Sequence, residues 1–258
     1  LPSGGCGRNE KNRDLVVVGT GTCEELVKLL AEAYNKTAPG YQVIVPKSIG
    51  SSGGIRAVTE GEALMARVAR PLFAPPLKDL NYLPFARDMV VFMTGRANNV
   101  TNLTEQQILD IYSGRTTNWS QLGGRNAPIR PLIREERDTA YAILCRELPG
   151  FKEIKFGPQM KMVYLDPDML NIFEKYPTAI GWLTSASLQS KLQALAINGI
   201  APVRENLQSG KYKYVIEYAL ISQKKPLTVE AEKFVKFIFS ESGRKIIEDH
   251  GMLTLNRQ

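Results

Sequence analysis

Two stretches of this sequence combine glycines with hydroxyl side chains in a way that could bind an anion. The first, Ser48–Gly61, reads SIGSSGGIRAVTEG and follows an alternating apolar run at Tyr41–Val45. Its glycines allow tight turns and a close approach of the backbone to a ligand. Ser51 and Ser52 stand where a helix N-cap belongs, just before Gly53, so hydroxyls and first-turn N–H groups could donate to an oxyanion. An ordinary capped helix has the same pattern.

A second stretch of this kind lies near the start of the chain. The β-branched run Asp14–Gly19 (DLVVVG) leads directly into Thr20, Gly21 and Thr22, and such a run is typical of a strand buried in a parallel sheet. Glu24–Lys36 follows, with leucines at helical spacing and two acids in its first turn. This order of strand, Gly/Thr turn and helix predicts a second oxyanion cradle. It is not a dinucleotide-binding fingerprint, because the third glycine of that motif is missing.

The composition is that of an ordinary globular protein. The 258 residues are 43% hydrophobic and 23% charged, which argues against disorder. The formal net charge of +7 is compatible with nucleic acid, an anionic membrane surface or a small anionic ligand. Basic residues are spread along the chain and interleaved with acids, so nucleic acid is not expected as a partner. No run approaches the roughly 20 apolar residues of a membrane span.

Cysteine and histidine are too few to indicate a metal or catalytic centre. Cys6, Cys23 and Cys145 form no CxxC or CxxH spacing, and His250 is the single histidine. We therefore expect no metal, no cofactor and no Ser-His-Asp set. The cysteines allow one disulfide and one free thiol without indicating the pair. Ser3–Cys6 resembles the end of a bacterial lipoprotein signal, which makes Cys6 a candidate lipid anchor of an exported chain.

The periodicity of the remaining sequence predicts strands and helices that alternate along the chain. Strands are expected at Ala63–Ala69, Asp88–Thr94, Ile129–Ile133, Ala179–Leu183 and Tyr212–Ser222. Helices are expected at Leu103–Tyr112 with Thr104 as N-cap, Thr139–Leu148, Asp166–Tyr176 with Pro167 in its first turn, Val229–Phe239 and Gly243–His250. Such alternation indicates an α/β fold with mainly parallel sheets.

Two long strand-like runs, Leu83–Thr94 and Tyr212–Ser222, are candidates to cross between two lobes. One lobe would be discontinuous, with residues 1–86 and 217–258, and the other would comprise residues 87–216. Ligands of such sheets bind outside the carboxyl ends of the strands. The sequence therefore predicts a ligand cleft between the lobes.

Several segments resemble the phosphate-binding proteins of bacterial phosphate ABC transporters. Residues 49–61 (IGSSGGIRAVTEG) are similar to that family's first serine loop, and Ala69–Leu72 (ARPL) resembles the SRPL after its third strand. Leu103–Gly124 (LTEQQILDIYSGRTTNWSQLGG) resembles the family skeleton LT-x-x-Q-x-x-x-I-[FY]-x-G-x-x-x-NW-x-x-LGG and is the most specific match. Ala179–Trp182 (AIGW) and Lys213–Ser222 resemble the late strand and the return crossover.

This resemblance extends from about Asp14 to the C-terminus. It implies the two-lobed periplasmic-binding-protein fold of type II, with two mainly parallel sheets flanked by helices. It also implies that Thr22 lies near the family's first anion contact, that Ser51 is the serine whose hydroxyl and amide bind the oxyanion, and that Arg134 pairs with it. The ligand-binding residues that follow from the resemblance are Thr20, Gly21, Thr22, Ser51, Ser52, Gly53, Arg70, Arg134, Arg137, Asp138 and Thr139.

The chain departs from the family around Arg134. The family pattern R-x-x-G-S-G-T is one residue shorter here, and Arg137 and Asp138 replace its Gly-Ser-Gly. Ala69 stands where the family has an acid or a serine before RPL, and Leu64 stands where the family's strand usually has an Asp. A carboxylate acceptor distinguishes a protonated oxyanion from one without a proton, so its relocation to Asp138 would change selectivity.

The charged residues also have ordinary interpretations. Arg67 and Arg70 could be surface ion-pair residues, and Arg134 could form a solvated charge cluster with Glu135 and Glu136. For Cys23, a buried small residue is favoured over a reactive thiol. For Trp119 and Trp182, packing groups are favoured over ligand platforms.

The resemblance implies a monomeric binding protein, not an enzyme. It would capture a small oxyanion, with phosphate foremost, and deliver it to an ABC transporter permease in the periplasm or cell envelope. Two alternatives remain open. The same fold could bind a different anion as a sensor or signalling module, or it could be an enzyme acting on a phosphorylated or carboxylated small molecule. Glu135, Glu136 and Asp138 could do acid–base work, but their spacing matches no catalytic set.

Overall fold

Two long strands, β4 (Leu80–Gly95) and β11 (Val215–Gln223), each contribute residues to two compact units. The computed structural model describes residues 14–38, 40–72, 74 and 77–257. Unit 1 takes its described residues from Leu1–Val68, Leu77–Leu83 and Leu220–Ile246. Unit 2 takes its described residues from Ala69–Pro76, Pro84–Ala219 and Ile247–Gln258. Cys6, the candidate lipid anchor, lies outside the described residues.

Unit 1 is built on a sheet with the strand order β2-β1-β3-β11-β4. The central strand β1 (Leu15–Gly19) pairs in parallel with β2 (Val43–Ile44) and with β3 (Met65–Pro71). Leu15 and Val17 are fully buried, but Val16 between them is 41% exposed. The expectation of a strand buried on both faces is therefore wrong for one face, while the strand itself is present. The second strand is shorter than the alternating run at 41–45 suggests.

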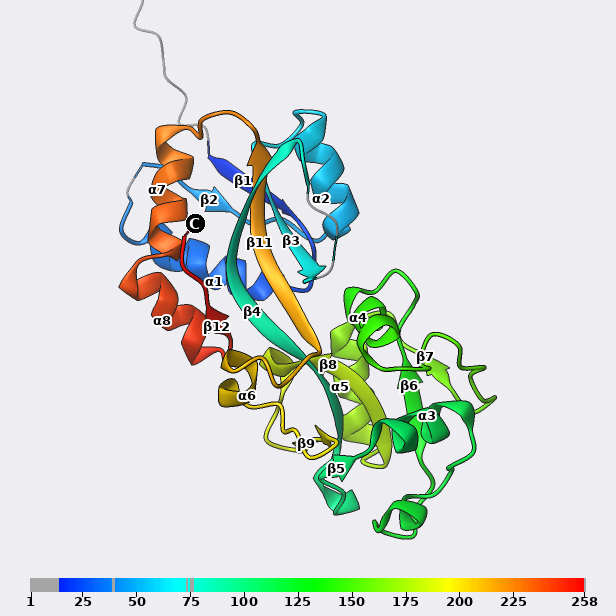
Figure 1. The fold of residues 1–258 in the computed structure, drawn as a ribbon. Coiled ribbons are helices and arrows are strands. Elements are labelled where there is room, and N and C mark those ends of the chain that lie inside the picture. The colour runs from blue at the N-terminus through cyan, green and yellow to red at the C-terminus, as the bar shows by residue number, and fades with distance from the viewer. Residues whose placement is uncertain (1–13, 39, 73, 75–76, 258) are drawn as a thin grey trace, which may run out of the picture. The chain divides into compact units, whose positions relative to one another are not determined.

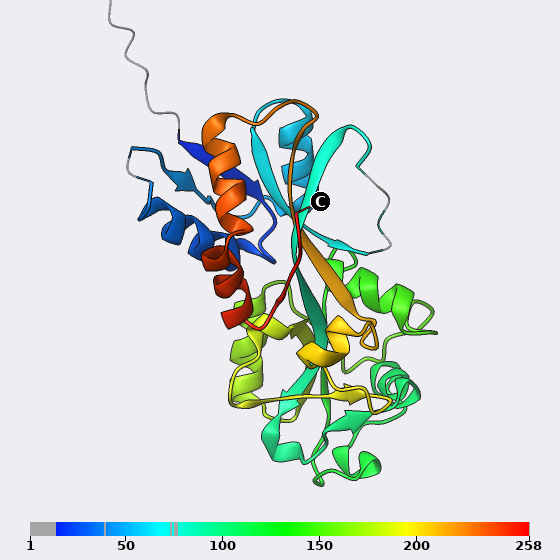
Figure 2. The ribbon, with the colours of Figure 1, turned by 60° about the vertical axis from the view of Figure 1, so that its left-hand side comes forward.

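Three helices belong to unit 1, and a fourth, α8 (Glu241–Asp249), begins in unit 1 and ends in unit 2. They are α1 (Glu24–Asn35), α2 (Gly50–Thr59), α7 (Val229–Ile238) and α8 (Glu241–Asp249). The ring of Tyr34 on α1 makes edge contacts with Phe234 and Phe237 at centroid distances of 5.4 and 5.6 Å. Figures 1 and 2 show the resulting pair of helices, with α7 beside α1.

Unit 2 contains a sheet with the order β4-β8-β6-β7. Strand β8 (Ala179–Thr184) runs antiparallel to β4 and parallel to β6 (Arg130–Ile133), which also pairs with β7 (Lys161–Met162). The helices of this unit are α3 (Glu105–Ser113), α4 (Thr139–Glu147), α5 (Asp166–Lys175) and α6 (Arg204–Gln208).

The core of unit 2 is aromatic on one face of β8. Gly181 lies against Met169 and Phe173 of α5, whereas the next side chain, Trp182, points to the opposite face, as strand geometry requires. There Trp182 contacts the rings of Phe92 and Tyr112 at centroid distances of 5.8 and 5.5 Å. Trp182 is 1% exposed and Trp119 is fully buried, so both tryptophans are confirmed as packing groups.

Several local signals of the sequence are confirmed. Thr104 caps α3 in a reciprocal capping box with Gln107, and Pro167 occupies the first turn of α5. Several short elements were not predicted, among them β5 (Asn102–Leu103), β7, β9 (Leu192–Ala194), β10 (Ala196–Ile197), β12 (Leu253–Thr254) and α6. Within the described chain, no helix has the length and apolar run that a membrane crossing requires.

Candidate functional site

The loops that follow β1 and β2 lie against each other in unit 1. Ile49 donates its backbone N–H to the carbonyl of Gly19 at 2.9 Å. A Cβ at Gly21 would lie 3.3 Å from the Cβ and Oγ of Ser48, so the absence of a side chain permits this approach. Residues Thr20–Thr22, from the second of the two predicted stretches, therefore adjoin the N-terminus of α2. We call these two loops together the unit 1 half-site.

Two threonine hydroxyls interact within this half-site. Thr20 Oγ1 donates to Thr22 Oγ1 at 3.2 Å, and the backbone N–H of Thr22 donates to Thr20 Oγ1 at 3.3 Å. Thr20 is 5% exposed, whereas Gly21 and Thr22 are exposed. The buried threonine thus holds the exposed one in place, and the Thr22 hydroxyl is accessible to a ligand.

The prediction that Ser51 or Ser52 is the N-cap of α2 is wrong by two or three residues. The helix begins at Gly50 and its N-cap is Ile49, which provides no side-chain cap. Instead Ser48 Oγ accepts from the backbone N–H of Gly50 at 3.1 Å. Ser51 and Ser52 lie within the first turn, where Ser51 is half-buried and Ser52 exposed. Gly53 follows them, and a Cβ there would meet the Ile49 side chain at 3.3 Å.

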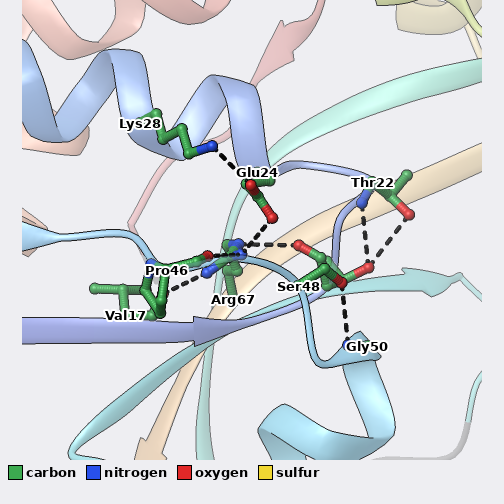
Figure 3. A network of polar contacts seen from close by, with 9 residues as sticks. Val17, Thr22, Glu24, Lys28, Pro46, Ser48, Gly50 and Arg67 are labelled. Atoms are coloured by element: carbon green, nitrogen blue, oxygen red, sulfur yellow. Dashed lines mark hydrogen bonds and ion pairs between the residues drawn. The ribbon is translucent and has the colours of Figure 1, made fainter. Parts of the chain in front are cut away.

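Arg67 is a buried residue that hydrogen-bonds to the segments of this half-site. It is not the surface ion-pair residue that the sequence allowed. Its side chain is fully buried. The guanidinium donates to the backbone carbonyls of Val17, Thr20 and Pro46 and to Glu24 Oε2. The bonds to Thr20 and to Glu24 are both 2.9 Å long, and Figure 3 shows Arg67 at the centre of this network. Arg67 therefore ties β1, the loop after it and the first turn of α1 together.

Glu24 completes the charge balance of this network. Burial alone would raise the pKa of its carboxyl, but the hydrogen bond and charge of Lys28 and the charge of Arg67 lower the pKa below its ordinary value. Lys28 Nζ lies 2.7 Å from Glu24 Oε1. Since Glu24 stays ionised, the buried guanidinium is neutralised inside unit 1 and is not a free cation for a ligand.

The last residue of β1, Gly19, can only be a glycine without strain. Its φ of +128° lies in a region that side chains rarely adopt. A Cβ at this position would lie 2.0 Å from the carbonyl oxygen of Arg67. The same carbonyl accepts from the Thr20 N–H at 3.1 Å, so this glycine lets β3 approach the start of the loop.

In unit 2, Arg134 follows β6 directly and lies between the first turns of two helices. Its Nη2 is 3.3 Å from Asp138 Oδ2 and 3.1 Å from Asp166 Oδ1. The Arg134 side chain is only 11% exposed. The interpretation as a solvated cluster with Glu135 and Glu136 is therefore wrong, because those two acids are exposed while Arg134 pairs with others. We call Arg134, Asp138 and Asp166 the unit 2 half-site.

Asp138 has two roles at the start of α4. One oxygen, Oδ1, accepts from the backbone N–H of Tyr141 at 2.9 Å and caps the helix. The other, Oδ2, accepts from Arg134 Nε at 3.4 Å. The carboxylate predicted to act on the ligand is thus also a structural cap of α4.

Asp166 was not predicted as a site residue. It is the first residue of α5, and the strand before it pairs with β6 through Ile133 and Met162, which places it beside Arg134. Burial raises the pKa of its carboxyl; the Arg134 charge lowers the pKa and the Asp138 charge raises it, with a net increase. The sequence signal was an acid in the first turn of a helix after a strand adjacent to β6, which is too common a pattern to indicate a site.

One donor of this half-site has no acceptor. Arg134 Nη1 is buried and no described residue accepts from it. Buried donors are nearly always paired, and leaving one unpaired costs about 1–3 kcal/mol. The guanidinium of Arg67, by contrast, donates to acceptors within the protein.

The remaining predicted residues differ in their placement. Thr139 is half-buried and donates its hydroxyl to the carbonyl of Ala69 at 3.4 Å. Arg70 follows Ala69 at the end of β3 and is also half-buried. Arg137 is exposed and forms no ion pair with any residue that the structure describes. Thr139, the first residue of α4, thus follows the N-cap Asp138 directly, and the role of Arg137 stays a prediction.

Two of the cysteines, Cys23 and Cys145, lie within the described residues. Cys23 is 1% exposed and confirmed as a buried small residue, and burial raises the pKa of its thiol to about 12. Cys23 and Cys145 are both free thiols. Among the described residues, no group of three or more His, Cys, Asp or Glu side chains could hold a metal ion.

Comparisons with known proteins agree with this architecture. A family model described as a PBP superfamily domain matches residues 7–242. The phosphate-binding protein PstS of Borreliella burgdorferi is 24% identical over 257 residues, covering 95% of this chain and 92% of that protein. The protein of the same name from Bacillus subtilis is 25% identical over 258 residues, covering 96% and 82%.

Solved structures show the same fold. A candidate phosphate ABC transporter substrate-binding protein from Clostridium perfringens, solved with phosphate bound, gives a TM-score of 0.83 at 24% identity, covering 95% of this chain and all of that one. An ABC-type phosphate transport receptor from Vibrio cholerae gives 0.73 at 24% identity, covering 93% and 99%. The predicted α/β fold of the type II periplasmic binding proteins is confirmed. Since the family model matches most of its length, the chain belongs to the PBP superfamily.

Proposed function

We propose that this chain is a solute-binding protein that captures a small oxyanion, with phosphate foremost, for delivery to an ABC transporter. The observation that carries the proposal is Arg134 Nη1, a buried donor without an acceptor among the described residues. The names of the relatives from Borreliella and Bacillus, both phosphate-binding proteins, support phosphate as the anion.

Each half-site is proposed to contain groups that suit an oxyanion. The unit 1 half-site offers the Thr22 hydroxyl, the Ser51 hydroxyl and the first-turn N–H groups of α1 and α2, which suit a negative charge because a helix N-terminus carries partial positive charge. The unit 2 half-site offers the Arg134 guanidinium, which can bind two oxygens of an oxyanion in parallel.

The two carboxylates beside Arg134 favour an anion that keeps a proton. Asp138 and Asp166 both lie within 3.3 Å of Arg134 Nη2, so this group of three carries a net negative charge when both acids are ionised. A ligand hydroxyl could donate to either carboxylate, whereas a fully deprotonated anion would be repelled. Phosphate keeps a proton at neutral pH and sulfate does not, so we propose that the site prefers phosphate.

The proposal is tested by a thermal-shift screen of protein that has been unfolded and refolded to strip any bound ligand. Phosphate, sulfate and small carboxylates would each be added over a wide concentration range. A ligand at about 1,000 times its Kd stabilises the folded state by about 4 kcal/mol, so phosphate should raise the melting temperature far more than sulfate. A rise with a carboxylate and none with phosphate would contradict the assignment.

The cellular role follows from the same proposal. We propose a monomeric, non-enzymatic protein of the periplasm or cell envelope whose partner is an ABC transporter permease. Size-exclusion chromatography with light scattering tests the monomer, and incubation with a chromogenic phosphate monoester tests for catalysis. Release of the chromogen at a rate that follows protein concentration and is lost in the Asp138→Asn variant would favour the enzyme instead.

A further inference from the structure

Thr20 is a buried residue of the unit 1 half-site whose hydroxyl faces Thr22. Only 5% of Thr20 is exposed. Among the described residues, its side chain forms hydrogen bonds only with Thr22, donating to the hydroxyl at 3.2 Å and accepting from the backbone N–H at 3.3 Å. Figure 3 draws both bonds where they reach Thr22. Thr20 therefore offers a ligand little surface, and its hydroxyl acts on one neighbour.

The backbone of Thr20 is held on both sides by Arg67. The Thr20 N–H donates to the Arg67 carbonyl at 3.1 Å, and the Thr20 carbonyl accepts from Arg67 Nε at 2.9 Å. Arg67 is itself fully buried. Because the backbone is held at both ends, the Thr20 hydroxyl is directed towards Thr22 before any ligand binds. Such preorganisation lowers the cost of ordering a binding group when the ligand arrives.

The direction of these hydrogen bonds leaves the hydroxyl proton of Thr22 unused. A threonine hydroxyl carries a single proton, and Thr20 uses its own to donate to Thr22 Oγ1. Thr22 Oγ1 is the acceptor in that bond, so its own proton points elsewhere, and no described residue accepts it. The Thr22 N–H is already bonded to Thr20 Oγ1. Thr22 thus presents one donor to its surroundings, the hydroxyl.

Two other exposed threonines of unit 1 use their hydroxyl protons within the protein. Thr37 Oγ1 donates to the carbonyl of Tyr34 at 2.8 Å, and Thr59 Oγ1 donates to the carbonyl of Ile55 at 2.9 Å. Thr22 is also exposed but forms no such bond in the described part of the chain. A donor that is oriented by a buried neighbour and has no acceptor suits a ligand oxygen that carries no proton.

We propose that Thr20 is a positioning residue of the anion site, which does not touch the anion and orients the Thr22 hydroxyl to donate to an unprotonated ligand oxygen. This inference rests on the proposed function, because Thr22 is the residue that contacts the anion. It differs from the direct ligand contact that the family resemblance implies for Thr20. Without the Thr20 hydroxyl, the Thr22 side chain is free to rotate and its N–H loses its acceptor.

The first measurement uses no ligand. Amide hydrogen exchange of Thr22, followed by NMR on the full chain, reports the bond from its N–H to Thr20 Oγ1. Exchange should be about three- to tenfold faster in Thr20→Val than in the wild type, the scale of one hydrogen bond. Thr20→Ser should restore the slow rate, because serine keeps the hydroxyl. Equal rates in the wild type and Thr20→Val would overturn the proposal.

A double-mutant cycle tests whether Thr20 acts through Thr22. Titration calorimetry with phosphate would compare Thr20→Val, Thr22→Val and the double variant. Thr22→Val should weaken binding about tenfold or more, the scale of a hydrogen bond to a charged group, and Thr20→Val about three- to tenfold. The double variant should bind no more weakly than Thr22→Val, since coupled residues are not additive, and Thr20→Ser should bind as the wild type does. Additive losses would overturn the proposal, because Thr20 would then act without Thr22.

Thr37→Val is the matched control, because it makes the same change at a unit 1 hydroxyl outside the half-site. It should leave phosphate affinity and the exchange of Thr22 unchanged. Equal losses of affinity in Thr37→Val and Thr20→Val would overturn the proposal. A wild type that binds no phosphate would overturn the proposed function and the role of Thr20 with it. Phosphate binding that is the same in the wild type and Thr20→Val would overturn the role of Thr20 alone.

Discussion

Arg134 and Asp166 meet at 3.1 Å between the end of β6 and the first turn of α5. Asp138 lies 3.3 Å from the same guanidinium nitrogen, and the other terminal nitrogen, Nη1, has no acceptor among the described residues. The Arg134 guanidinium thus pairs with both carboxylates through Nη2, while its Nη1 has no acceptor among the described residues. The net charge of the half-site therefore depends on pH and on whether positions 138 and 166 both carry an acid. The charge of a bound ligand depends in turn on its own protonation.

The Asp166→Asn variant should be more stable than the wild type at neutral pH when no anion is bound. Burial and the Asp138 charge raise the pKa of Asp166 in the folded state, and Arg134 only partly offsets them. Well below the ordinary aspartate pKa of about 3.9, the carboxyl is protonated in both the folded and the unfolded chain, so the substitution changes little. As pH rises through the raised pKa, ionisation costs stability that asparagine avoids.

The measurement is the melting temperature of both proteins in anion-free buffer between about pH 3 and pH 8, a range that brackets the ordinary pKa of aspartate, about 3.9. The difference should grow with pH. Asp168→Asn, an exposed acid of the same first turn, is the control and should show no such trend. A difference that shrinks as pH rises would mean that Arg134 stabilises the ionised form of Asp166 more than burial penalises it.

Asp138→Asn should reduce any preference for phosphate over sulfate. The substitution removes a charge that repels a fully deprotonated anion, and asparagine caps a helix about as well as aspartate, so α4 should stay intact. Titration calorimetry with both anions measures the ratio of affinities. Asp138→Ala separates the two roles, because it should also lose about 1 kcal/mol of stability with the cap. An unchanged ratio in Asp138→Asn would remove Asp138 from the ligand site.

Arg67→Met should destabilise unit 1 by about 3 kcal/mol, because Glu24 and three backbone carbonyls would lose their buried partner. Urea unfolding followed by circular dichroism gives the free energy of unfolding. Arg56→Met, an exposed arginine on α2, is the control and should stay within about 0.5 kcal/mol of the wild type. Equal stability of the two variants would show that the network around Arg67 contributes little.

Ser51→Ala should mainly reduce the affinity for phosphate, whereas Ser48→Ala should mainly reduce the stability of the protein. Ser51→Ala should weaken phosphate binding by roughly 1–2 kcal/mol, the scale of a hydrogen bond to a charged group, with little loss of stability. Ser48→Ala removes the acceptor for the Gly50 N–H and should cost about 1 kcal/mol of stability with a smaller effect on affinity. Calorimetry and thermal melting of both variants distinguish the roles. If Ser51→Ala lowers the melting temperature and leaves affinity unchanged, Ser51 is a structural residue.

The sequence predicted most of the long elements because their signals are local. The β-branched run of β1, the capping box at Thr104 and the proline at position 167 each depend on a few neighbouring residues, and each is confirmed. The aromatic core around Trp182 was predicted only as packing, since ring contacts join residues far apart in the chain.

The polar networks were harder to predict because burial and long-range pairing decide them. Arg67 looks like any charged residue of a strand, and only the approach of β1 and the first turn of α1 surrounds it with acceptors. Asp166 lies 32 residues after Arg134 in the sequence and becomes its neighbour through the pairing of β6 with β7. The N-cap of α2 was misplaced because Ser48, Ser51 and Ser52 are all good capping residues, and backbone conformation selects among them.

The most direct test of the central claim is the affinity of refolded protein for phosphate with and without the Arg134 side chain. Titration calorimetry would compare the wild type, Arg134→Gln and, as a matched control, Arg137→Gln, an exposed arginine three residues away. We expect Arg134→Gln to lose on the order of 2–5 kcal/mol, which is roughly thirty- to a few thousand-fold in affinity, and Arg137→Gln to bind as the wild type does. Wild-type binding of phosphate that survives in Arg134→Gln, or a wild type that binds no phosphate at all, would contradict the claim.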